Sequence, residues 1–260
     1  MLKPSFPTAL HSNTAELTRD YFLAIPTVDT VLVVNSCARG VAVAESDLDF
    51  AILVKPGTTP DERFAMENSW HIYSQTQPTV IQYKKSNKFA HLHLDIVVGN
   101  YRPGIVGNGE PVDYFEVEIG NQICYSAPMD KVGSHFKELQ AAWLPYYNEE
   151  LRTQRLAMTR EACEYDLDHL SLFVKRGLFF QAFDILCKAF QQYLQTLFIA
   201  HKTYPIAYNK WIKEQIVKWL KMPDLYEKLP PILSISNIES NEILEKASLL
   251  RKLLDTITTE

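Results

Sequence analysis

The sequence predicts an α+β protein in which a small mixed β-sheet comes first and an α-helical bundle follows. Short β-rich runs, separated by turn-forming residues, occupy the chain from Val31 to about Met129. After Pro128 the pattern changes, and apolar residues recur at the spacing of one face of a helix. We therefore expect two domains, residues 1–128 for the sheet and residues 129–260 for the bundle.

The first domain is expected to contain two helices packed on several strands. Helical patterns cover Thr14–Leu23 and Pro60–Ser74. The strand candidates are rich in β-branched and aromatic residues and are flanked by turns. In chain order they are the runs VLVVN, LDFAILV, VIQYK, HLHLDIVV, YFEVEI and QICYS.

Four helices are expected in the second domain. The first spans Asn148–Lys175 and is followed by Gly177, a residue type that commonly ends helices. The second spans Leu178–Ala200 and carries a continuous apolar stripe. The third and fourth cover about Asn209–Lys221 and Glu242–Ile257, and such a set of amphipathic helices predicts a bundle.

The composition is that of a globular protein with an acidic balance. Of the 260 residues 47% are hydrophobic, and the net charge is -5. A long polyanion is disfavoured as the main partner, because nucleic acid requires a dense basic surface. No apolar run reaches the roughly 18 to 20 residues that cross a bilayer, and the four cysteines form no CxxC pair. We expect a cytoplasmic protein with reduced thiols and no membrane contact.

The stretch from 31 to 54, VLVVNSCARGVAVAESDLDFAILV, carries the chemistry. A buried strand leads through a turn into a second strand that bears Asp47 and Asp49. Because side chains alternate along a strand, these two carboxylates point to the same face and suit a hard cation such as Mg²⁺. The turn at Asn35 and Ser36 would offer a hydroxyl and backbone N–H groups to phosphates, and Arg39 would add a positive charge.

A third acidic group is expected from the run HLHLDIVV. Its alternation points Leu92, Leu94 and Ile96 to the core and Asp95 to the cleft, beside the other two carboxylates. Three neighbouring carboxylates repel one another, so metal would stabilise such a cluster. Two alternatives remain open at this point. One is a triad of His91, His93 and Asp95 for a softer metal, and the other uses Glu116 and Glu118 as bases on one face of the YFEVEI run.

The run N-S-x-A-R-G followed by S-D-L-D-F-A-I-L resembles the G-S-x-A-R-G and S-D-[LIV]-D signature of the polymerase-β-like nucleotidyltransferases. A small catalytic domain followed by helices is also similar to the antibiotic nucleotidyltransferases, which modify aminoglycosides or lincosamides. The chain departs from the signature at Asn35, where the family has Gly. Asn is the residue other than Gly that best tolerates positive φ, so the turn is expected to persist.

The resemblance assigns roles residue by residue. It implies two Mg²⁺ ions bound by Asp47 and Asp49, with Asp95 as third ligand or general base. It implies that Ser36 and Ser46 contact the triphosphate of ATP. In the helical half, a triphosphate contact is expected of Lys188, and contacts to the nucleotide or the acceptor are expected of Tyr204 and Lys210.

The expected reaction is transfer of AMP from ATP to a hydroxyl of a small molecule, with release of pyrophosphate. The acidic balance favours a cationic acceptor such as an aminoglycoside, which predicts a role in antibiotic resistance. One alternative is nucleotidyl transfer to a protein or to tRNA, although the sequence shows no concentrated basic patch for tRNA. Another is a nucleotide-binding module without turnover. The aromatic-rich bundle is also compatible with a homodimer.

Overall fold

The computed structural model describes residues 2–105 and 109–258, and the α+β class is confirmed. The chain forms two compact units. Unit 1 combines the residues up to Tyr101 with Glu118–Leu144, and unit 2 combines Arg102–Val117 with the chain from Pro145 onward. The segment Arg102–Val117 therefore belongs to the helical unit, although residues of unit 1 flank it on both sides in the sequence.

Unit 1 is built on a mixed sheet, which in the described residues consists of β1 (Val28–Val33), β2 (Leu48–Val54), β3 (Leu92–Val97) and β4 (Ala127–Pro128). The strand order is β3-β2-β1-β4. β1 pairs antiparallel with β2 and β4, whereas β2 and β3 run parallel. The predicted strands VLVVN, LDFAILV and HLHLDIVV are confirmed, because they supply β1, β2 and β3.

Helices complete unit 1. The two helices predicted for the first domain, Thr14–Leu23 and Pro60–Ser74, are confirmed, because they lie within α1 and α3. α3 begins with a capping box, in which the Thr59 hydroxyl accepts a bond from the Glu62 amide and the Glu62 carboxylate accepts one from the Thr59 amide. The helices are α1 (Ala9–Leu23), α2 (Asn35–Arg39), α3 (Pro60–Thr76), α4 (Pro78–Ser86), the π-helix η1 (Gly120–Cys124) and α6 (Ser134–Trp143).

Three predicted strands are wrong. VIQYK lies within α4, YFEVEI lies mostly in the short helix α5 (Phe115–Ile119), and QICYS overlaps η1. In α4, Pro78 stands at the first turn, where a helix tolerates proline, and Val80 and Tyr83 are buried three residues apart on one helical face. Short apolar runs fit a strand and a buried helix equally well, and here the proline and the burial pattern decide for the helix.

The start of α6 is held by β1 through Asp29. Its two carboxylate oxygens accept hydrogen bonds from the backbone amides of His135, at 3.1 Å, and Phe136, at 3.0 Å. The Thr30 hydroxyl donates to the same carboxylate and accepts a bond from the Gly133 amide. These bonds satisfy N–H groups that a helix start leaves without intrahelical partners, and they attach α6 to the sheet of unit 1.

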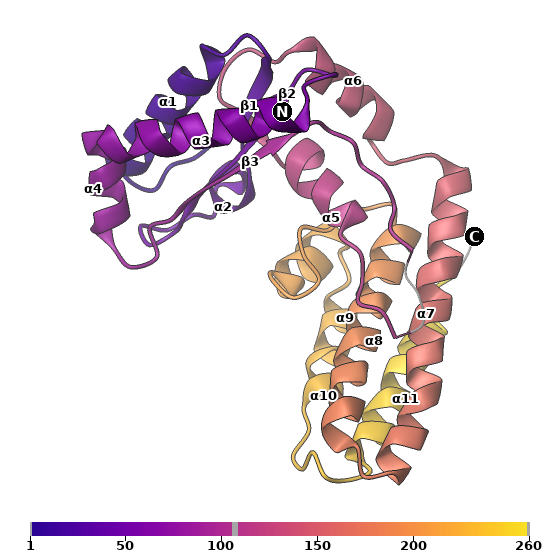
Figure 1. The fold of residues 1–260 in the computed structure, drawn as a ribbon. Coiled ribbons are helices and arrows are strands. Elements are labelled where there is room, and N and C mark those ends of the chain that lie inside the picture. Colours follow the sequence, from indigo (N-terminus) through magenta and orange to yellow (C-terminus); the bar gives the residue numbers. More distant parts are fainter. Residues whose placement is uncertain (1, 106–108, 259–260) are drawn as a thin grey trace. The chain divides into compact units, whose positions relative to one another are not determined.

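Unit 2 is helical, and α7 and α8 lie along each other with α11 packed on both (Figure 1). The predicted first, second and fourth helices are confirmed, and Gly177 follows α7 with a φ of +70°. The third is shorter than predicted, because Trp211 has a φ of +57° that no α-helix accommodates. The elements are α7 (Glu149–Lys175), α8 (Phe179–Ala200), the π-helix η2 (Glu214–Trp219), α9 (Pro223–Lys228), α10 (Pro230–Leu233) and α11 (Glu242–Leu254).

A buried ion-pair network lies inside unit 2. The guanidinium of Arg155, on α7, contacts Asp113 at 2.6 Å and Glu116 at 2.7 Å. Gln195, on α8, donates to the same two carboxylates. Arg155 is 2% exposed and Glu116 is fully buried. The network attaches the segment Arg102–Val117 to both long helices.

Among the described residues, no helix has the length and apolarity that a membrane crossing requires.

Candidate metal centre

Two carboxylates stand at the beginning of β2. Leu48 and Phe50 point into the core of unit 1 and are at most 1% exposed. Because side chains alternate along the strand, the neighbours Asp47 and Asp49 project from the opposite face, where both are half-buried. The predicted pairing of these two carboxylates on one face is therefore present in the structure.

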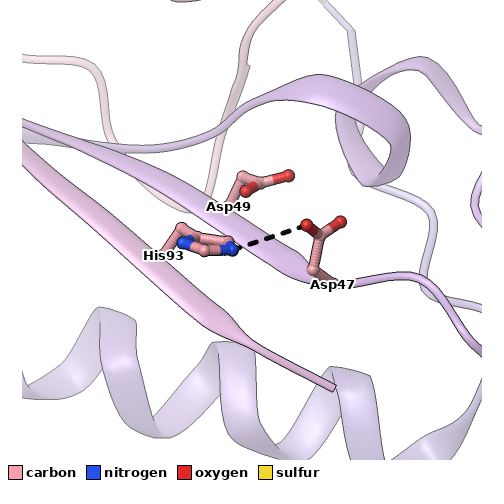
Figure 2. Close-up of side chains that lie close together, drawn as sticks. All are labelled: Asp47, Asp49 and His93. Carbon is pink, nitrogen blue, oxygen red and sulfur yellow. Dashed lines mark ion pairs between the residues drawn. The ribbon is translucent and has the colours of Figure 1, made fainter. Parts of the chain in front are cut away.

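The register of the parallel pair brings a histidine to the two carboxylates. Asp49 lies opposite His93 in the ladder between β2 and β3. The Nε2 atom of His93 is 3.6 Å from Oδ2 of Asp47, and one ligand atom from each of the three side chains lies within 4.8 Å of the others. Figure 2 shows the carboxylates and the imidazole ring turned toward one another. The group has the composition and spacing to hold a metal ion.

The donor set bears on which ion fits. Two carboxylates supply the oxygen ligands that Mg²⁺ prefers, and a site of this kind leaves positions for water and for substrate phosphates. The imidazole of His93 adds a nitrogen donor, which suits Zn²⁺ and the later transition metals better than Mg²⁺. The residues present therefore fit a divalent cation, and the histidine widens the range of ions beyond magnesium.

The negative charge of the site affects the groups behind it. The pKa of the Cys37 thiol rises to about 12, first because the thiol is buried and then because Asp49 and Asp47 are nearby. Burial and the same two carboxylates also raise the pKa of Tyr83. The Tyr83 hydroxyl donates to the Ser46 carbonyl at 3.1 Å. Cys37 and Tyr83 therefore stay uncharged where they contact the chain that enters β2. The negative charge of the site is carried by Asp47 and Asp49.

The chain between β1 and β2 forms α2, a short helix where the sequence predicted only a turn. Asn35 has a φ of +57°, so it takes the left-handed conformation for which the family signature has Gly. The Val34 amide donates to the Asp49 carbonyl at 3.0 Å, and the Cys37 thiol lies 3.9 Å from the Asp47 carbonyl. The segment that carries Ser36 therefore adjoins the two carboxylates in the fold.

The other predicted contacts of unit 1 lie around this segment. The Ser46 hydroxyl accepts a hydrogen bond from the Val43 amide at 2.9 Å, in the turn immediately before Asp47. Ser36 and Arg39 are both half-buried on α2. The charge of Arg39 lies close enough to Tyr125 to counter part of the rise in the pKa of Tyr125, a rise that burial causes.

Asp95 is on the same face of β3 as His93 but two residues further along the strand. It pairs with Ala51 rather than with Asp49, it is exposed, and it is not among the three residues whose ligand atoms converge. Sequence reasoning thus gave the third position to Asp95, and the structure places His93 there. His93 and Asp95 lie two residues apart, so the sequence already indicated that their side chains share one face of the strand. The register of β3 against β2, which decides between them, could not be predicted from the sequence. His91 is also outside the group.

The remaining candidates belong to unit 2 or to its border. Lys188 pairs with Asp184 at 3.0 Å along α8, and Lys210 is exposed, with its carbonyl accepting a bond from Gln215. Tyr204 is 1% exposed and packs on Tyr146, so its ring belongs to the core. The idea of Glu116 and Glu118 as bases on one strand face is wrong, because α5 is a helix and Glu116 is buried against Arg155.

No family model matches the sequence, and no curated protein matches it either. The evidence on function therefore comes from the residues themselves and from their arrangement.

Proposed function

We propose that this protein is a metal-dependent nucleotidyltransferase that moves AMP from ATP to a hydroxyl group of a small molecule. The observation that carries the proposal is the convergence of Asp47, Asp49 and His93 on one face of the sheet, directly beside the α2 segment. The resemblance of that segment and of β2 to the polymerase-β-like signature supports the same reaction.

In this proposal Asp47 and Asp49 bind two Mg²⁺ ions, and His93 is a further ligand on the same face. The bound cation would neutralise charge on the triphosphate and favour ionisation of the acceptor hydroxyl. Ser36 and Ser46 bind triphosphate oxygens through their hydroxyls, and Arg39 contributes its positive charge.

The reaction itself breaks one phosphoanhydride bond and forms one phosphoester bond. The acceptor oxygen forms a bond to the α-phosphorus of ATP, while the bond between that phosphorus and the oxygen bridging to the β-phosphate breaks. Pyrophosphate leaves with the electron pair of the broken bond. Asp95, exposed two residues beyond His93 on β3, is proposed as the general base that takes the proton of the acceptor hydroxyl.

The acceptor class follows from charge. The chain carries a net charge of -5, so a cationic, polyhydroxylated acceptor such as an aminoglycoside is favoured. If the acceptor is instead a protein or tRNA, or if the protein binds nucleotide without turnover, no small molecule in the screen should stimulate pyrophosphate release.

The experiment is pyrophosphate release from each of the four nucleoside triphosphates, with Mg²⁺ or Mn²⁺, screened against aminoglycosides, lincosamides and other hydroxylated small molecules. Release that requires one acceptor, and that Asp47→Ala abolishes, supports the proposal. The matched control is Asp20→Ala, which removes an exposed carboxylate paired with Arg19 on α1. If Asp47→Ala and the parent release pyrophosphate at equal rates, the proposed mechanism is wrong.

A further inference from the structure

Unit 2 contains a cavity of about 330 Å³ that the proposed reaction does not use. Its walls come from α8, from the loop that precedes η2, and from α9 and α10. Phe190 and Tyr208 form part of its inner wall and are at most 8% exposed. Ile212, Tyr226 and Leu233 lie nearer its opening. The size is within the range of small-molecule sites and is too small for a helix of a partner protein.

The wall opposite α8 is held in place by Gln215. This side chain is fully buried, and its oxygen accepts a hydrogen bond from the Ile206 amide at 2.9 Å. Its nitrogen donates to the carbonyls of Ala207 and Lys210, each at 2.9 Å. One glutamine therefore fixes both ends of the loop that carries Tyr208 into the cavity. The cavity is a preformed feature of the fold rather than a gap between mobile segments.

The backbone around this wall departs from ordinary helical geometry. η2 is a π-helix, and Trp211 and Lys221 on either side of it have φ values of +57° and +58°. Positive φ is unfavourable for such large side chains, and π-helical turns occur preferentially at functional sites.

The lining selects against charged ligands. None of the described residues that line the cavity is Asp, Glu, Lys, Arg or His, and burying an ion without a partner is costly. Aromatic and aliphatic side chains make up most of the surface. The lining residues carry polar groups in the amides of Gln191 and Asn209, the free thiol of Cys187 and the hydroxyls of Tyr208 and Tyr226. The Tyr208 hydroxyl donates to Glu116, and the other groups suit one or two hydrogen bonds to a ligand. The chemistry is therefore that of a site for an uncharged, flat molecule.

We propose that this cavity binds an uncharged aromatic ligand of about the size of one or two fused rings, held by Phe190, Tyr208 and Tyr226 and oriented by Asn209 and Gln191. The site is independent of the proposed transfer reaction, because its residues all belong to unit 2 and none is a candidate metal ligand. It also has the opposite preference to the cationic acceptor expected at the metal centre.

The test uses the full-length protein with indole as probe and tryptamine as its charged counterpart. Iodoacetamide alkylation of Cys187 is followed by mass spectrometry, with half-buried Cys124 of unit 1 as internal reference. At about ten times its Kd, indole leaves roughly a tenth of the cavities empty and should slow Cys187 alkylation about tenfold. Cys124 should react at an unchanged rate, and tryptamine should protect Cys187 far less.

Two filling variants and one control make the result specific. Ile212→Phe and Leu233→Phe place a larger side chain in the cavity and should each remove the protection by indole. Leu249→Phe makes the same kind of change at a residue of α11 that is 42% exposed and lies outside the cavity, and it should leave the protection intact. Absence of protection in the parent, equal protection of Cys124, or equal protection by tryptamine would each overturn the proposal.

Discussion

Asp49 and His93 occupy directly opposed positions on the parallel strands β2 and β3. This pairing places a nitrogen donor, His93, next to the oxygen donors Asp47 and Asp49.

The first prediction concerns metal preference. Asp49→Asn should weaken both Mg²⁺ and Zn²⁺ binding by more than about tenfold, since even loss of an outer-shell partner of a ligand costs that much. His93→Ala should weaken Zn²⁺ binding more than Mg²⁺ binding, because imidazole suits the softer ion.

Isothermal titration of each metal into the full chain checks this prediction. Asp20→Asn serves as the control, because Asp20 is an exposed carboxylate of α1. Unchanged Zn²⁺ affinity in Asp49→Asn would show that the three side chains do not form a metal site.

A second prediction concerns the left-handed backbone at Asn35, whose φ is +57°. Asn35→Gly should keep the stability of the parent, because Gly adopts this conformation without strain. Asn35→Ala should lower the free energy of unfolding by about 1 kcal/mol, since a Cβ-bearing residue without a local polar side chain is disfavoured there. Urea denaturation of the two variants makes the comparison. Equal stability of the Ala and Gly variants would contradict the backbone argument.

The third prediction tests the attachment of α6 to the sheet. Asp29→Ala removes the acceptor of two backbone amides at the start of α6 and should lower the free energy of unfolding by about 1 to 2 kcal/mol, as loss of a helix cap does. Hydrogen exchange should speed up at the first amides of α6. In the parallel variant Asp20→Ala, an exposed pair with Arg19 is lost and these amides should exchange at the parental rate.

Removal of Arg155 gives the fourth prediction. Arg155→Met leaves the carboxylates of Asp113 and Glu116 without their buried cation, and breaking such a pair costs about 3 to 5 kcal/mol. Arg251→Met removes a pair with Asp168 whose partners are 37% and 68% exposed, and it should cost about 0 to 1 kcal/mol. Urea denaturation midpoints of the two variants give the comparison. A similarly small decrease in the free energy of unfolding in both variants would mean that the buried network contributes little to stability.

The fifth prediction follows from Glu149, whose pKa is lowered from 4.5 to about 2, first by its hydrogen bond to Arg152 and then by Lys202. A lowered folded-state pKa stabilises the protein above the unfolded value, and this stabilisation is lost as pH falls from 4.5 toward 2. Glu149→Gln should therefore be less stable than the parent at neutral pH, with the difference shrinking as pH falls through that window. Urea titrations at several pH values make the comparison, and a stability difference that stays constant through that window would contradict it.

The sequence was sufficient for the elements whose pattern is long or strongly buried. α7 and α8 follow from apolar periodicity over many turns, and β2 follows from its uninterrupted apolar run after Asp49. The short runs VIQYK, YFEVEI and QICYS could not be resolved, because five or six apolar and polar residues fit either a strand or one helical turn. Their conformation depends on packing partners that lie elsewhere in the chain.

The candidate site was predictable in part for a similar reason. The i, i+2 spacing of Asp47 and Asp49 is a property of one strand and can be read directly. The third member depends on the register between β2 and β3, which is fixed by packing of the two strands and not by either sequence alone. A shift of two residues in that register would have brought Asp95, rather than His93, opposite Asp49.

The chain passes between the two units after Tyr101, after Val117 and after Leu144. The carboxylates that balance Arg155 are therefore encoded upstream of α6, which belongs to the sheet unit. A gene carrying only the last 116 residues would encode α7 and α8 but would omit these carboxylates. Recombination with a single crossover would either divide the helical unit or carry Glu118–Leu144 of the sheet unit along with it, so the two units are expected to be inherited together.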